Sequence, residues 1–137
     1  MPLAIAGDVH LMLAVGIIWG TTNALMKKGA LIWDKHTPKS KPQSSLTGHV
    51  IAAVKTIISL VLTWQYSVPV VLNLAASAAF FGVLGKVPIS VAVPVTNGVT
   101  FVATAGVGMG LGEECGRVGE VLGGVAMIVV GVWLCVS

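Results

Sequence analysis

Residues 91–111 read VAVPVTNGVTFVATAGVGMGL, and none of them carries a charge. A helix rises about 1.5 Å per residue, so this stretch is about as long as the hydrocarbon core of a bilayer is thick, roughly 30 Å. A soluble domain of 137 residues cannot bury several such stretches, because its helices keep a polar face. The stretch therefore predicts a helix that crosses a membrane.

The rest of the chain has the same character. Three further apolar stretches lie at about residues 10–27, 68–87 and 118–136, and the span around the quoted stretch covers about 90–111. Charged residues make up only 9% of the chain, whereas soluble domains contain about 25%. The mean hydropathy of +0.95 agrees with this difference. We therefore expect an all-α, multi-pass membrane bundle of four transmembrane helices, folded as a single integral membrane domain over residues 1–137.

The positive charge gathers beside the first predicted span. A lysine-rich loop is predicted at 28–48, and in or beside it lie Lys27, Lys28, Lys35, Lys39 and Lys41. Short lysine-rich loops face the cytoplasm, so we expect this loop to be cytoplasmic and the N-terminus to lie on the opposite side. The same lysines suit contact with anionic lipid headgroups. Because the net charge of +3 is concentrated beside one span, it does not indicate a nucleic-acid partner.

Residues 49–66 predict a different kind of helix. Lys55, Ser59 and Thr63 recur every four residues and form one polar stripe on an otherwise apolar helix. Trp64 is typical of the membrane–water interface. We expect an amphipathic helix that lies at the cytoplasmic interface. A fifth, tilted span is the alternative, and it would place the later loops on the opposite side of the membrane.

A few polar side chains fall inside the predicted spans and are the candidates for binding a substrate. They are Asn97, Asn73, Thr96 and Thr100. The structural alternative is hydrogen bonding between helices, which contributes roughly 0.6–2 kcal/mol. No Asp, Glu or His lies in the middle of any predicted span. Since such groups usually carry the proton in proton-coupled antiport, their absence from the sequence argues against that mechanism.

The sequence also lacks the patterns of an enzyme. It has no group of His, Cys and acidic residues at metal-ligand spacing and no paired nucleophile and base. Metal sites and covalent catalysis depend on such arrangements. We therefore expect a protein that is not an enzyme and that needs no metal or cofactor.

Glycines in the last predicted span are spaced for helix packing. Gly124 and Gly131 are seven residues apart, and Gly119 and Gly123 form a small-xxx-small pair nearby. Such glycines lie on one helix face and let another helix approach closely. The partner is either a helix of the same chain or the last helix of a second copy in a homodimer.

Several short motifs along the chain resemble one known family. They are WGTTNALMKKG at 19–29, YSVP at 66–69 followed by Leu72 and Asn73, VAVPVTN at 91–97 and LGE at 111–113. In this order they cover nearly the whole chain except the lysine-rich loop. The chain resembles the transmembrane protein 234 family, within the drug/metabolite transporter superfamily.

This resemblance implies a four-helix membrane protein, similar in layout to the small multidrug resistance proteins, which work as dimers. The last helix of those proteins carries two glycines at the spacing of Gly124 and Gly131. Their essential glutamate in the first helix has no counterpart here, because the residues before Trp19 are Val15, Gly16, Ile17 and Ile18. The resemblance therefore implies a fold and a membrane location, and the missing glutamate argues against proton-coupled drug export.

Two functions fit these observations. The first is a transporter-like membrane protein, working as a dimer, that handles a small polar or amphipathic solute near Asn97 and Asn73. The alternative is a non-transporting membrane component that binds partner proteins or anionic lipids through its last helix and its lysine-rich loop. The sequence does not select an organelle.

Overall fold

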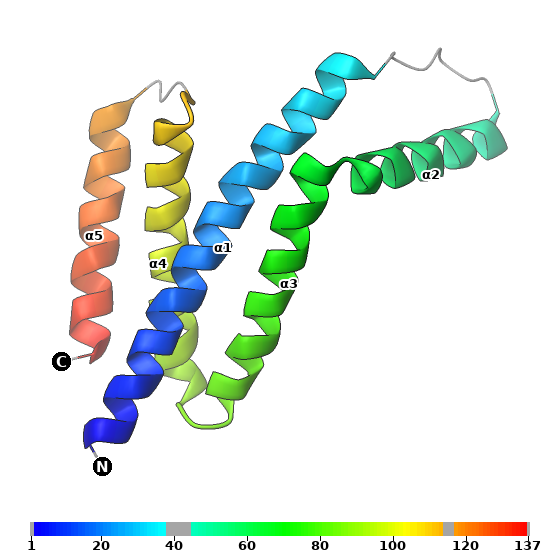
Figure 1. The fold of residues 1–137 in the computed structure, drawn as a ribbon. Coiled ribbons are helices and arrows are strands. Elements are labelled where there is room, and N and C mark those ends of the chain that lie inside the picture. The colour runs from blue at the N-terminus through cyan, green and yellow to red at the C-terminus, as the bar shows by residue number, and fades with distance from the viewer. Residues whose placement is uncertain (1, 38–44, 114–116, 137) are drawn as a thin grey trace.

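The computed structural model describes residues 2–37, 45–113 and 117–136, with side chains described between Asp8 and Leu134. These ranges form five helices, coloured in chain order in Figure 1, and contain no strand. The helices are α1 (Pro2–His36), α2 (Leu46–Leu62), α3 (Trp64–Leu84), α4 (Ile89–Gly110) and α5 (Val118–Val136). The all-α prediction is confirmed.

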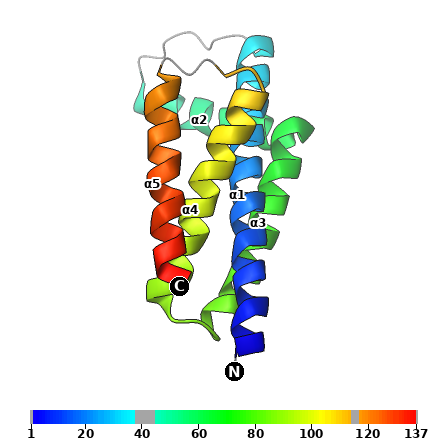
Figure 2. The same ribbon diagram turned by 90° about the vertical axis from the view of Figure 1, so that its left-hand side faces the viewer.

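The helices differ in their ability to cross a membrane. α1, α3 and α4 are each long and apolar enough to do so, whereas α2 and α5 are apolar but shorter over their described residues. α1, α3, α4 and α5 run alongside one another, while α2 projects sideways from one end of the bundle (Figure 1, Figure 2). The structure thus supplies three candidate spans. A fourth crossing by α5 and an interfacial position for α2 stay predictions.

The first helix is longer than the sequence pattern predicts. We expected a span that ends near residue 27 and a loop that begins at 28, but α1 continues to His36. Lys27 and Lys28 do not stop it, because lysine is a good helix former and its long side chain can carry the charge to the interface. The first proline after α1 in the sequence is Pro38, and residues before a proline disfavour the helical conformation.

The helix expected at 49–66 is divided between α2 and α3. The backbone of Thr63 is extended (φ −77°, ψ 111°), which ends α2 and lets α3 begin at Trp64. The Thr63 hydroxyl donates to the Ser59 carbonyl at 2.9 Å instead of capping α3. Ser59 itself accepts a hydrogen bond from the Trp33 indole of α1 at 3.0 Å. Part of the polar stripe of α2 is therefore used against α1.

The first helix, α1, is the centre of the bundle, because it packs on both α3 and α4, whereas α5 packs on α4. Glycines allow the contact with α4. A Cβ atom at Gly16 would lie 2.8 Å from the Thr96 carbonyl oxygen, and one at Gly20 would lie 2.6 Å from the Thr100 carbonyl oxygen. Both distances are shorter than side chains tolerate, so α1 and α4 touch through their backbones at this level.

Candidate functional site

The side chain of Asn73 is used to join α1 to α3. Its Nδ2 donates to the Thr22 hydroxyl at 2.8 Å and to the Asn23 Oδ1 at 3.4 Å. The Trp19 indole donates to the Asn73 backbone carbonyl and to the Ser77 hydroxyl, both at 3.2 Å. Such interhelical bonds hold membrane helices in register. The Asn73 side chain therefore makes the kind of structural contact that was the alternative to substrate binding.

Thr96 and Thr100 are buried, and the contact of Gly16 with the Thr96 carbonyl places this part of α4 against α1. The Thr100 hydroxyl donates to the Thr96 carbonyl, and the Thr104 hydroxyl donates to the Thr100 carbonyl, both at 2.8 Å. The Thr96 hydroxyl has no hydrogen-bond partner among the described residues. This face of α4 is thus a row of hydroxyls, of which one is left unpaired.

Asn97 lies on another face of α4. Its side chain is exposed near the middle of the helix and has no hydrogen-bond partner in the described part of the chain. It lines a groove of about 350 Å³ between α4 and α5, together with Pro94, Gly98, Phe101, Ile128, Gly131 and Val132. The structure therefore does not bring Asn97 and Asn73 together.

The separation of Asn97 from the threonines follows from helix geometry. Residues four apart lie on one face of a helix, whereas consecutive residues differ by about 100° around the axis. Thr96 and Thr100 share the face toward α1, so the neighbour of Thr96 is turned away from it. The four candidate residues divide among three environments, and their substrate-binding role stays a prediction.

The glycines of α5 are open to the surroundings. A Cβ atom placed at Gly119, Gly123, Gly124 or Gly131 would meet nothing within 4 Å. α5 instead packs on α4 through larger side chains, and Val132 and Ile128 lie 2.8 and 3.0 Å from a Cβ built at Gly98. At none of the four glycines would an added Cβ meet another helix among the described residues. Packing against a second chain stays a prediction.

Sequence reasoning missed the glycines that do form helix contacts. Gly16 and Gly20 touch α4, and a Cβ at Gly29 would lie 2.7 Å from the Gln65 carbonyl oxygen at the start of α3. The signal was present, because Gly16 and Gly20 are four residues apart and form a small-xxx-small pair.

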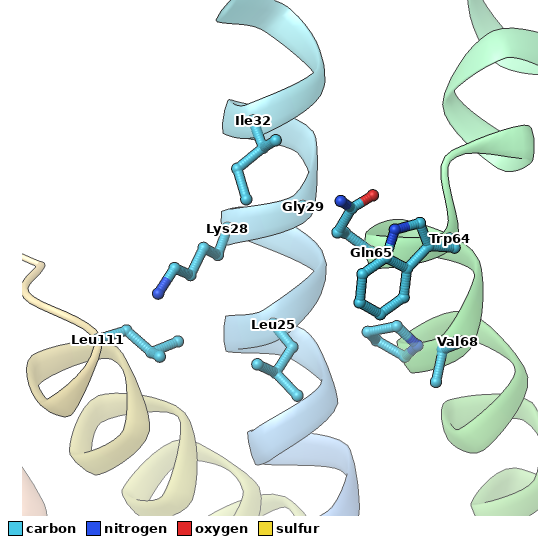
Figure 3. Close-up of a pocket in the computed structure, with 9 residues that line it drawn as sticks. Leu25, Lys28, Gly29, Ile32, Trp64, Gln65, Val68 and Leu111 are labelled. Carbon is cyan, nitrogen blue, oxygen red and sulfur yellow. The ribbon is translucent and has the colours of Figure 1, made fainter.

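A cleft of about 330 Å³ lies between α1, the start of α3 and the end of α4. Figure 3 shows Lys28 and Leu111 at one side of it, Trp64 and Val68 at the other, and Leu25 between them. Its lining is apolar except for Lys28, Gln65, the indole N–H of Trp64 and backbone atoms. The cleft thus combines an apolar surface with one cationic side chain, that of Lys28.

The predicted lysines have different roles in this region. Lys27 forms an ion pair with Glu113, just after α4. Lys28 lines the cleft and has no ion pair or hydrogen bond with the described residues. Lys35 is exposed in the last turn of α1, and Lys39 and Lys41 lie outside the described residues. Lys28 is therefore the cation that the cleft places beside an apolar surface.

Comparison with known proteins places the chain in a family. The family model described as "Putative transmembrane family 234" matches residues 12–136. A transmembrane protein 234 homolog from Dictyostelium discoideum is 36% identical over 129 residues, which are 92% of this chain and 91% of that protein.

A transmembrane protein 234 homolog from Anopheles gambiae is 30% identical over 124 residues, covering 90% of this chain and 82% of that protein. No solved structure matches the chain. The apolar helices and these matches lead to one conclusion. The chain is a multi-pass integral membrane protein that belongs to the transmembrane protein 234 family.

Proposed function

We propose that this chain works as a homodimer with the transporter-like fold of the drug/metabolite transporter superfamily. In this proposal α5 crosses the membrane as a fourth span, and the dimer holds a small polar or amphipathic solute beside Asn97. The observation that supports it is the exposed, unpartnered amide of Asn97 near the middle of α4, a helix long and apolar enough to span.

An unpaired amide is unfavourable at this depth. The hydrocarbon region offers no water, so a polar group without a partner costs several kcal/mol there. An asparagine side chain has both donors and acceptors. Two copies of Asn97 related by a two-fold axis can therefore pair with each other, or both can bind one polar group of a solute.

The surroundings of Asn97 suit a second copy of the chain. Gly131 lies in the same groove, and a Cβ there would meet nothing within 4 Å. Gly124, two turns earlier on α5, is equally open. Open glycines let a partner helix approach closely enough for van der Waals contact, which drives helix association in lipid.

The dimer is tested by energy transfer between two differently labelled populations of the full chain, mixed in vesicles. We expect Asn97→Leu to weaken association about tenfold, because a buried amide pair contributes about 1–2 kcal/mol. Asn97→Gln should retain most of it, since the amide is kept. Energy transfer that is the same for wild type and Asn97→Leu would contradict the proposal.

Solute binding is tested separately by thermal unfolding of the wild type in detergent with a broad panel of small polar and amphipathic solutes. A solute that raises the midpoint of the wild type should have no effect on Asn97→Ala. If dimers form but no solute of the panel changes the midpoint, the alternative gains support. In that alternative the chain binds partner proteins or anionic lipids through its last helix and its lysine-rich loop, and it transports nothing.

A further inference from the structure

The cleft beside Lys28 lies on a different side of the bundle from the groove of Asn97. It is formed where α1 passes the start of α3, at the end of the bundle from which α2 projects (Figure 1). The Trp64 side chain is 70% exposed at this end, and tryptophan prefers the headgroup level of a bilayer. The cleft therefore opens where headgroups meet acyl chains.

The charges around the cleft leave one cation available. Lys27 is paired with Glu113, whereas Lys28 has no partner among the described residues. Trp64 and Gln65, the first residues of α3, lie across the cleft from Lys28 (Figure 3). Lys28 is therefore the cation that favours an anionic group in this cleft.

The walls of the cleft suit a hydrocarbon chain. Leu25, Ile32, Val68 and Pro69 line it, and its volume of about 330 Å³ lies at the lower end of the range of about 300–1,000 Å³ for sites that enclose a small molecule. A free anion would leave this apolar surface uncovered. A whole phospholipid is too large for the cleft. The upper part of one acyl chain fits the apolar walls, and the phosphate of the same lipid fits beside Lys28.

We propose that the cleft between α1 and α3 binds one anionic phospholipid, with its phosphate at Lys28 and the start of an acyl chain against Leu25, Val68 and Pro69. The site lies away from the α4–α5 groove, so it does not depend on the proposed dimer. This site differs from a general attraction of the lysine-rich loop to an acidic membrane, because it requires one particular lysine, Lys28, and the apolar surface of the cleft.

Two tryptophans make the site testable by fluorescence. Trp64 lines the cleft, whereas Trp133 lies on α5, and their exposed fractions are similar, 70% and 66%. The full chain is placed in phosphatidylcholine vesicles that contain a minor fraction of phosphatidylglycerol with brominated acyl chains, which quench nearby indoles. The contribution of each indole is the quenching that is lost when that tryptophan is replaced, in Trp64→Phe or in Trp133→Phe.

We expect brominated phosphatidylglycerol to quench Trp64 at lower concentration than Trp133, and brominated phosphatidylcholine to show no such preference. Lys28→Gln should raise the concentration needed at Trp64 about fivefold, the effect of one lysine charge at an anionic surface. Lys35→Gln is the matched control on the same helix and should change it less than about twofold, because Lys35 does not line the cleft and salt screens its charge there. Val68→Phe, which fills the cleft and keeps the charge, should also weaken quenching at Trp64.

Three results would overturn the assignment. One is equal quenching of both tryptophans by the anionic lipid, and another is an equal effect of Lys28→Gln and Lys35→Gln, which would indicate diffuse attraction. The third is release of the lipid from Trp64 by inorganic phosphate in a saturable manner that Lys28→Gln abolishes. That result would show that Lys28 binds free phosphate and not the phosphate of a lipid.

Discussion

At the scale of single residues, the buried hydroxyl of Thr96 is the least expected feature of the bundle. Thr100 and Thr104 donate to carbonyls of the preceding turn, but the Thr96 hydroxyl has no partner among the described residues. A buried polar group left unpaired costs about 1–3 kcal/mol. Valine has nearly the same shape as threonine and carries no such group.

We therefore expect Thr96→Val to leave the free energy of unfolding unchanged or to raise it by about 1–2 kcal/mol. The measurement is equilibrium unfolding in mixed detergent micelles. Thr100→Val is the control, because its hydroxyl is satisfied and its removal should stabilise nothing. If Thr96→Val is clearly less stable than the wild type, the hydroxyl has a partner outside the described chain, and its role as a candidate solute contact gains support.

At the scale of helices, composition predicted well which segments are helical and poorly how they meet. The apolar stretch at 91–111 became α4 almost unchanged, since an uncharged segment of that length has few other stable forms in lipid. The end of the first helix was misplaced by about nine residues, because lysine marks an interface without ending a helix. The local sequence pattern therefore predicts that a segment is a helix more accurately than it predicts where the helix ends.

The direction of each polar side chain required the structure. Spacing alone showed that Thr96 and Thr100 share a face, but it could not show which neighbouring helix that face meets. Asn97 and Asn73 looked alike as lone amides in apolar spans. Asn73 forms interhelical hydrogen bonds, whereas Asn97 is exposed without a partner among the described residues. The difference depends on which helix packs on which, and the spacing of residues within one helix does not show that.

The contact between α1 and α4 depends on Gly20. A Cβ there would lie 2.5 Å from the Ala103 Cβ and 2.6 Å from the Thr100 carbonyl oxygen, a backbone atom that cannot move aside alone. We expect Gly20→Ala to lower the free energy of unfolding by about 1–3 kcal/mol, the usual effect of overpacking. Gly82→Ala is the control, because a Cβ at that helical glycine meets nothing within 4 Å. Equal unfolding midpoints in detergent for both variants would show that α1 and α4 do not touch here.

Across the whole bundle, two contacts indicate which helix ends lie on the same side of the membrane. The ion pair of Lys27 with Glu113 brings the second half of α1 to the end of α4. The approach of Gly29 to Gln65 brings the same part of α1 to the start of α3. α3 therefore begins at the end of the bundle that α1 reaches, which supports an interfacial α2 over a fifth crossing.

Cysteine labelling from each side of sealed vesicles tests this path. In a background without the two native cysteines, we expect Ser45→Cys and Lys86→Cys to react with an impermeant reagent from opposite sides. Both residues are exposed, and the chain between them contains α2 and α3. If α2 lies at the interface, one crossing separates the two positions; if α2 also spans, two crossings return them to the same side. Labelling of both from one side would therefore establish the fifth span and place the cleft of Lys28 in a different environment.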